Sequence, residues 1–181
     1  MPAAEPRVFI SYKHGPMTPV AQKFYNKLKI NGPGMGLAGT FMDAKVIAGG
    51  DLWREQVQQA LEASTRFVAF LEDDYWLSDE CQNELRRAVE RFTARDGMKL
   101  LFVKAGEIAP ELLLFDAPAG AATGAGRPED ETRRQLKRVG DLQFLGPFND
   151  MAQLITLVRA DDPKLDAQLF QLMKQLQASL V

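Results

Sequence analysis

Apolar and polar positions follow each other along the chain in segments typical of strands and helices. Short, almost wholly apolar runs predict buried strands, because the strands of parallel sheets are covered on both faces. Apolar residues that recur every three to four positions predict helices with one buried face. The predicted strands are Val8–Tyr12, Thr40–Met42, Arg66–Leu71, Lys99–Val103 and, at an edge, Gln143–Leu145.

Helical periodicity fills the intervals between these strands. The predicted helices cover residues 18–30, 51–64, 78–96, 128–138, 151–159 and 162–180. Strands that alternate with helices at this spacing predict an α/β domain with a parallel sheet. The segment 116–126 is rich in glycine and alanine and is predicted to be a surface loop.

The helix predicted after Ser78 carries an unusual carboxylate. Ser78 is a suitable N-cap, and acidic residues follow it in the first turn, where the helix dipole favours negative charge. The apolar stripe of this helix consists of Cys81, Leu85, Ala88 and Phe92. Glu84 lies on the border of that stripe, and periodicity alone favours a partly shielded surface glutamate.

Composition excludes several classes of protein. A length of 181 residues suits one domain, and a formal net charge of −2 argues against general nucleic-acid binding. With one cysteine and one histidine, the chain cannot form an internal disulfide and lacks the ligands of a structural zinc site. No apolar run approaches the roughly 20 residues that span a bilayer. We therefore expect a cytoplasmic protein without a bound metal or a membrane segment.

The segment 34–39 matches the dinucleotide-binding pattern G-x-G-x-x-G. That pattern binds a pyrophosphate when a strand precedes it and the N-terminus of a helix follows it. Here a predicted helix precedes the glycines and a predicted strand follows them, so the helix dipole has the wrong direction. We interpret these glycines as the end of a helix.

Several motifs, in a fixed order, resemble those of TIR (Toll/interleukin-1 receptor) domains. Val8–Tyr12 (VFISY) resembles the first strand of that family. Phe41–Asp43 and the loop that leads to Gly49–Asp51 resemble its second strand and BB loop. Trp76–Leu85 (WLSDECQNEL) resembles the third helix of bacterial and plant members. Many members have Pro-Gly in the BB loop, where this chain has Ala48–Gly50.

The resemblance implies a fold and a division of the chain. TIR domains have a flavodoxin-like, five-stranded parallel sheet flanked by helices, and we assign residues 1–160 to such a domain. Residues 161–181 are predicted to form a C-terminal helix, which either completes the fold or connects it to a sensor domain.

The resemblance also implies an activity. Enzymatic members cleave NAD+ at the nicotinamide–ribose bond, and the position of their catalytic glutamate is matched by Glu84. They release linear ADP-ribose or a cyclised isomer, are activated by self-assembly with other TIR domains, and in bacteria often serve in antiphage defence. Nicotinamide leaves as a neutral molecule and needs no general acid, so one carboxylate suffices. NAD+ is then a substrate, and no cofactor is expected.

Further residues are predicted to lie at the carboxyl edge of the sheet, where open α/β folds bind ligands. The predicted substrate-binding residues are Ser11, Tyr12, Lys13, Asp43 and Trp76. The resemblance assigns Lys45, Val46, Ile47, Gly49 and Gly50 to the BB loop and to assembly. Trp76 could instead pack under the helix, Lys13 could be an ordinary solvated lysine, and Asp43 could merely fix its loop. For His14 we expect a hydrogen bond within its loop.

Two other functions remain open from the sequence. Some TIR domains are non-catalytic modules that only recruit other TIR domains. Nucleoside deoxyribosyltransferases and related N-glycosidases share the sheet topology and use a glutamate to cleave the same type of bond. The pattern around Glu84 favours the NAD+-cleaving enzyme over both.

Overall fold

One parallel sheet forms the centre of the molecule. The computed structural model describes residues 7–37, 39–42, 51–105, 144–148, 158–160 and 162–178. Within these residues the strands are β1 (Arg7–Tyr12), β2 (Gly39–Met42), β3 (Arg66–Leu71), β4 (Lys99–Ala105) and β5 (Phe144–Phe148). Their order in the sheet is β2-β1-β3-β4-β5, and every neighbouring pair is parallel. This is the flavodoxin-like order, so the predicted fold class is confirmed.

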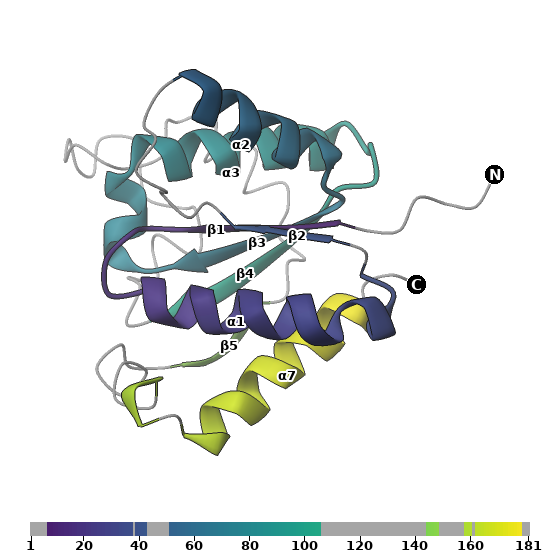
Figure 1. Cartoon of the computed structure of the whole chain (residues 1–181). Helices are drawn as coiled ribbons and strands as arrows, with labels where there is room; N and C mark the ends of the chain where they lie inside the picture. The colour runs from purple at the N-terminus through teal and green to yellow at the C-terminus, as the bar shows by residue number, and fades with distance from the viewer. Residues whose placement is uncertain are drawn as a thin grey trace.

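Helices cover both faces of the sheet (Figure 1). On one face lie α1 (Thr18–Asn31) and α7 (Pro163–Ala178), and on the other lie α2 (Asp51–Ala63) and α3 (Asp79–Thr93). Two short 3-10 helices complete the described elements, η1 (Pro33–Met35) and η2 (Asp73–Leu77). Among the described residues, no helix combines the length and the apolar character needed to cross a membrane.

The alternation of side chains along β1 divides the core between the two faces. Val8, Ile10 and Tyr12 belong to the apolar cluster beneath α1 and α7, whereas Phe9 belongs to the cluster beneath α2 and α3. Successive residues of a strand point to opposite faces, so Ser11 shares the face of Phe9. A serine therefore points into the layer between the sheet and α3, and its side chain is fully buried there.

Most predicted elements agree with the structure within a few residues. The helix predicted for 162–180 spans Pro163–Ala178, and the predicted edge strand spans Phe144–Phe148. Pro147 is accommodated in that strand because β5 lies at the edge of the sheet. As expected, a helix precedes the glycines of this pattern and a strand follows them: Gly34 and Gly36 come after α1, and Gly39 begins β2, which is the wrong geometry for a dinucleotide. The loop 116–126 and the helix 128–138 lie outside the described residues, as does most of 151–159.

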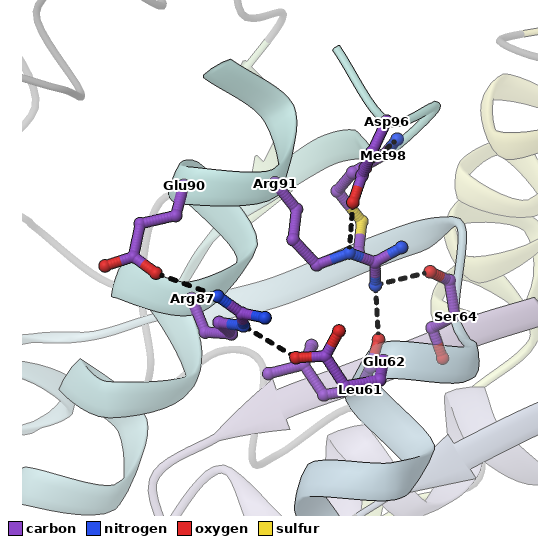
Figure 2. A network of polar contacts seen from close by, with 8 residues as sticks. All are labelled: Leu61, Glu62, Ser64, Arg87, Glu90, Arg91, Asp96 and Met98. Carbon is purple, nitrogen blue, oxygen red and sulfur yellow. Dashed lines mark hydrogen bonds and ion pairs between the residues drawn. The ribbon is translucent and has the colours of Figure 1, made fainter. Parts of the chain in front are cut away.

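Arg91 joins the end of α3 to the end of α2 (Figure 2). Its Nη1 donates hydrogen bonds to the carbonyl oxygens of Leu61 at 2.6 Å and of Ser64 at 2.8 Å. Its Nε donates to Asp96 Oδ2 at 2.6 Å, in the turn after α3. The last carbonyls of a helix have no partner inside the helix, and a cation is favourable there. The buried guanidinium therefore fixes α2 against α3.

Replacement of Arg91 by methionine should destabilise the protein. Methionine keeps much of the side-chain volume but removes the Arg91 donor from the carbonyls of Leu61 and Ser64, of which Leu61 keeps the backbone N–H of Ser64 at 3.1 Å. We expect the free energy of unfolding, measured in urea, to fall by about 2–3 kcal/mol. Arg87→Met is the matched control, because Arg87 pairs with Glu62 and Glu90 at the surface, where such pairs contribute less than about 1 kcal/mol. Equal losses in the two variants would contradict this role of Arg91.

Candidate active site

The switch point of the sheet brings β1 and α3 together. The chain leaves β1 toward β2 on one side, while β3 lies on the other side, and Ser11 pairs with Ala69 of β3. In open α/β sheets, ligands bind beside the carboxyl ends of the strands at such a point. Ser11 is the penultimate residue of β1 and therefore lies at this position.

Glu84 is directed toward this point by α3. The helix starts as predicted, because Ser78 Oγ accepts a hydrogen bond from the Cys81 backbone N–H at 3.3 Å. Glu84 is buried with a residual exposure of 6%, beside Leu85 and close to Ala88 in the sequence. A charged side chain at such a depth requires a hydrogen-bonding partner. Ser11 Oγ provides one by donating a hydrogen bond of 2.6 Å to Glu84 Oε2.

A second hydroxyl extends this contact. Tyr75 lies in η2, between β3 and α3, and its Oη is 2.8 Å from Ser11 Oγ. The same hydroxyl can donate to the carbonyl oxygen of Cys81 at 3.3 Å. The strand β1 and the consecutive elements η2 and α3, more than 60 positions later, therefore contribute to one buried polar network around Glu84.

Burial keeps the neighbours of Glu84 protonated. The pKa of Tyr75 is raised well above its ordinary value, chiefly by burial and further by Cys81, once its thiol is ionised at high pH, and by the Glu84 carboxylate. Burial also raises the pKa of the Cys81 thiol to about 12. This thiol donates a hydrogen bond of 3.4 Å to the carbonyl oxygen of Tyr12. Both groups are neutral near pH 7, and Cys81 acts as a packing residue rather than a nucleophile.

A pocket of about 350 Å³ lies beside Glu84, between α2 and α3. Its volume is within the range of small-molecule sites. Its lining residues are Trp53, Arg54, Val57, Gln58 and Leu61 from α2, and Glu80, Asn83, Glu84 and Arg87 from α3. An indole, two arginines and a buried carboxylate therefore surround one cavity. Such a set can hold an aromatic ring, an anionic group and a centre of developing positive charge.

The structure describes several of the residues that are predicted from the sequence to bind the substrate. Tyr12 is buried, and its ring lies 4.9 Å from that of His14, measured between centroids. Lys13 and His14 are half-buried in the turn after β1. The positive charge of Lys13 slightly lowers the pKa of Cys81, against the larger effect of burial. The substrate-binding roles of Ser11, Tyr12 and Lys13 remain predictions.

The remaining residues predicted for substrate binding and assembly lie wholly or partly outside what the structure describes. Asp43 and the BB loop, with Lys45, Val46, Ile47, Gly49 and Gly50, belong to the undescribed range 43–50. The backbone of Trp76 is described within η2, but its side chain is not. Their predicted roles in substrate binding and assembly remain predictions.

Two parts of the site were missed in the sequence. Tyr75 was not singled out, because the sequence offers no period to follow in the short turn between a strand and a helix. The residues of α2 that line the pocket were not assigned to a site, because Trp53, Val57 and Leu61 also fit the apolar face of an ordinary helix. Trp53, Arg54, Val57, Gln58 and Leu61 in fact follow helical spacing along one side of α2, which could have indicated a surface shared with α3.

Comparison with known proteins agrees with this architecture. A model of the TIR domain family matches residues 8–136 of the chain. Among solved structures, the TIR domains in the activated Roq1 resistosome, which directly recognises the pathogen effector XopQ, are similar in fold with a TM-score of 0.57. That match covers 86% of this chain and 98% of the other, at 19% sequence identity. No curated protein matches the chain.

The family match covers most of the chain and includes the strands and helices that build the site. It begins at Val8 in β1 and continues beyond β4, so that Ser11, Tyr75 and Glu84 all lie inside it. This protein belongs to the TIR domain family.

Proposed function

We propose that this TIR domain is an NAD+ glycohydrolase that cleaves the nicotinamide–ribose bond, with Glu84 as the catalytic carboxylate. The observation that carries the proposal is the position of Glu84, which is buried, hydrogen-bonded to Ser11 and part of the lining of a pocket. A glutamate that served only as helix surface would not need to be buried at the carboxyl end of β1.

The reaction suits a site with one catalytic carboxylate. The bond between C1′ of the ribose and the pyridinium nitrogen breaks, and its electron pair moves to the nicotinamide, which leaves as a neutral molecule. Positive charge then develops on C1′ and the ring oxygen, where Glu84 is proposed to stabilise it. Water adds to C1′ and loses a proton, so the products are nicotinamide, ADP-ribose and one proton. If a nitrogen of the adenine attacks C1′ in place of water, the product is a cyclic isomer.

The charges in the pocket support binding of a dinucleotide. Arg54 and Arg87 lie on the two helices that form the pocket and can attract the diphosphate. Arg87 already donates hydrogen bonds to Glu62 and Glu90, so the diphosphate would compete with these two carboxylates for its guanidinium. The indole of Trp53 offers a surface for stacking on adenine or nicotinamide. Lys13, Asp43 and Trp76 are proposed to complete the site from the sheet edge.

Self-assembly is the proposed means of activation. The similar TIR domains belong to an assembled complex, the activated Roq1 resistosome. In the present chain, the BB loop with Lys45, Val46, Ile47, Gly49 and Gly50 is proposed to contact a neighbouring copy. Leu52, next to this loop at the start of α2, is strongly exposed and offers apolar surface for the same contact.

Replacement of Glu84 by glutamine should abolish NAD+ cleavage. Glutamine keeps the size of the side chain and can still accept the hydrogen bond from Ser11, but it cannot stabilise positive charge. We expect release of nicotinamide, measured by chromatography, to fall by at least about 100-fold. The matched control is Glu55→Gln on the exposed surface of α2, which should keep full activity. Undiminished turnover in a folded Glu84→Gln variant would refute the proposal, as would a wild-type protein that neither binds nor cleaves NAD+ when assembled.

The specific activity should also depend on protein concentration. If the active form is an assembly, turnover per molecule should rise when the protein is concentrated or crowded, because association follows mass action. Nicotinamide release measured over a dilution series, together with light scattering, tests this. A constant turnover per molecule in a series in which the protein changes from monomer to oligomer would contradict activation by assembly.

A further inference from the structure

We propose that Ser11 and Tyr75 are positioning residues for Glu84, forming a relay of two hydroxyls that fixes one carboxylate oxygen through a chain from η2 to β1 to α3. This inference rests on the proposed function of Glu84. It concerns how the carboxylate is held rather than what it does to the substrate.

Counting hydrogens gives the direction of the relay. A serine hydroxyl has one hydrogen, and Ser11 donates it to Glu84 Oε2 at 2.6 Å. The contact of 2.8 Å between Ser11 Oγ and Tyr75 Oη must then use the hydrogen of Tyr75. Tyr75 also has the carbonyl oxygen of Cys81 as an acceptor, but at the longer distance of 3.3 Å. The distances favour donation from Tyr75 to Ser11 and from Ser11 to Glu84.

The same atoms can serve the protonated carboxyl group with the opposite direction. A neutral Glu84 can donate its proton to Ser11 Oγ, so that Ser11 donates to Tyr75 Oη and Tyr75 donates to the Cys81 carbonyl oxygen. Each hydroxyl then keeps an acceptor in both charge states, which matters because unmet buried polar groups are costly. The network can therefore hold Glu84 in one place whether or not it is charged.

Burial makes the relay rigid and selective for Glu84. Ser11 and Tyr75 are both fully buried, so bulk water does not compete for their hydroxyls. Ser11 is held in the sheet by its pairing with Ala69, and Tyr75 belongs to the apolar cluster beneath α2 and α3. The two hydroxyls therefore fix the orientation of the Glu84 carboxylate before the substrate binds. A carboxylate oriented in advance stabilises the positive charge of the transition state more strongly.

The test uses the full chain with three single variants, one double variant and two controls. Ser11→Ala removes the direct donor, Tyr75→Phe removes the outer hydroxyl and keeps the ring, and Ser11→Thr restores a hydroxyl. Ser64→Ala is the matched control for serine, because Ser64 is also buried and donates to the carbonyl oxygen of Ala60 at 2.7 Å, away from Glu84. Tyr25→Phe on α1 is the control for tyrosine.

The first readout is steady-state NAD+ cleavage. Ser11→Ala should lower kcat by about 10-fold to 100-fold, with little change in KM. Losses of this size are typical when a metal-binding side chain loses the residue that hydrogen-bonds and orients it. Tyr75→Phe should cause a smaller loss, and Ser11→Thr should recover most of the activity. Because Tyr75 acts through Ser11, the double variant Ser11→Ala/Tyr75→Phe should lose about as much as Ser11→Ala alone. Additive losses, or a change confined to KM, would overturn the relay.

The second readout does not require catalysis. The Glu84 carboxyl carbon is followed by NMR during a pH titration of protein labelled with ¹³C-glutamate, and Glu84→Gln identifies its signal. Ser11 has a hydrogen bond with Glu84 in both charge states, but the bond to the charged carboxylate is stronger by about 1 kcal/mol. Its loss in Ser11→Ala should therefore move the Glu84 midpoint about one unit toward higher pH. Among the residues that the structure describes, the titratable and charged groups near it are Tyr75, Cys81, Lys13, Glu80, Arg54 and Arg87.

The two proposals fail in different ways. An unchanged Glu84 midpoint in folded Ser11→Ala would overturn the positioning by Ser11 even if the wild-type protein cleaves NAD+. Absence of cleavage by the assembled wild-type protein would overturn the proposed function, while the NMR titration would still report whether Ser11 holds Glu84. We expect kcat and the Glu84 midpoint to be unchanged in Ser64→Ala, because this serine lies away from Glu84. Changes in Ser64→Ala as large as those in Ser11→Ala would overturn the positioning role of Ser11.

Discussion

The burial of one carboxylate is the constraint on which the candidate site depends. Glu84 lies between α3 and the sheet, where a charge without partners would be strongly unfavourable. The hydrogen bond of 2.6 Å from Ser11 meets this requirement, and it does so at the switch point of the sheet. Ser11 stands where an apolar residue would otherwise fill the core, and its hydroxyl supplies the hydrogen bond that the buried Glu84 needs.

Helix α3 carries two buried charges with different purposes. Arg91, near its C-terminal end, donates hydrogen bonds to the carbonyls of Leu61 in the last turn of α2 and of Ser64 just after it, and so fixes the two helices against each other (Figure 2). Glu84, two turns earlier, lines the pocket that these helices enclose. The position of Arg91 therefore bears on the site, because a change in the approach of α2 to α3 would alter the pocket.

Within the part of the chain that the structure describes, most strands and helices could be predicted from the sequence, and the fold class followed from their alternation and from the resemblance to a family. The apolar runs Val8–Tyr12 and Arg66–Leu71 became neighbouring central strands, and the periodicity after Ser78 became α3 with the expected cap. These features depend on the spacing of apolar residues and on local hydrogen bonds, which the sequence displays directly. Glu84 was also identified, but only because its motif resembles that of a family. Periodicity by itself favoured a surface position, whereas the structure shows a buried residue.

Only the tertiary structure decided what surrounds Glu84. Its partners Ser11 and Tyr75 are 73 and 9 positions away in the sequence, and a contact across such distances depends on which strands pair and which face each residue occupies. The alternation of β1 was visible beforehand, but the packing of α3 on the face of Phe9 and Ser11 was not. Likewise, α2 and α3 each displayed a helical face, and only their packing enclosed a pocket between them. Local spacing sets the elements of a chain, whereas a site made by several elements arises from their packing.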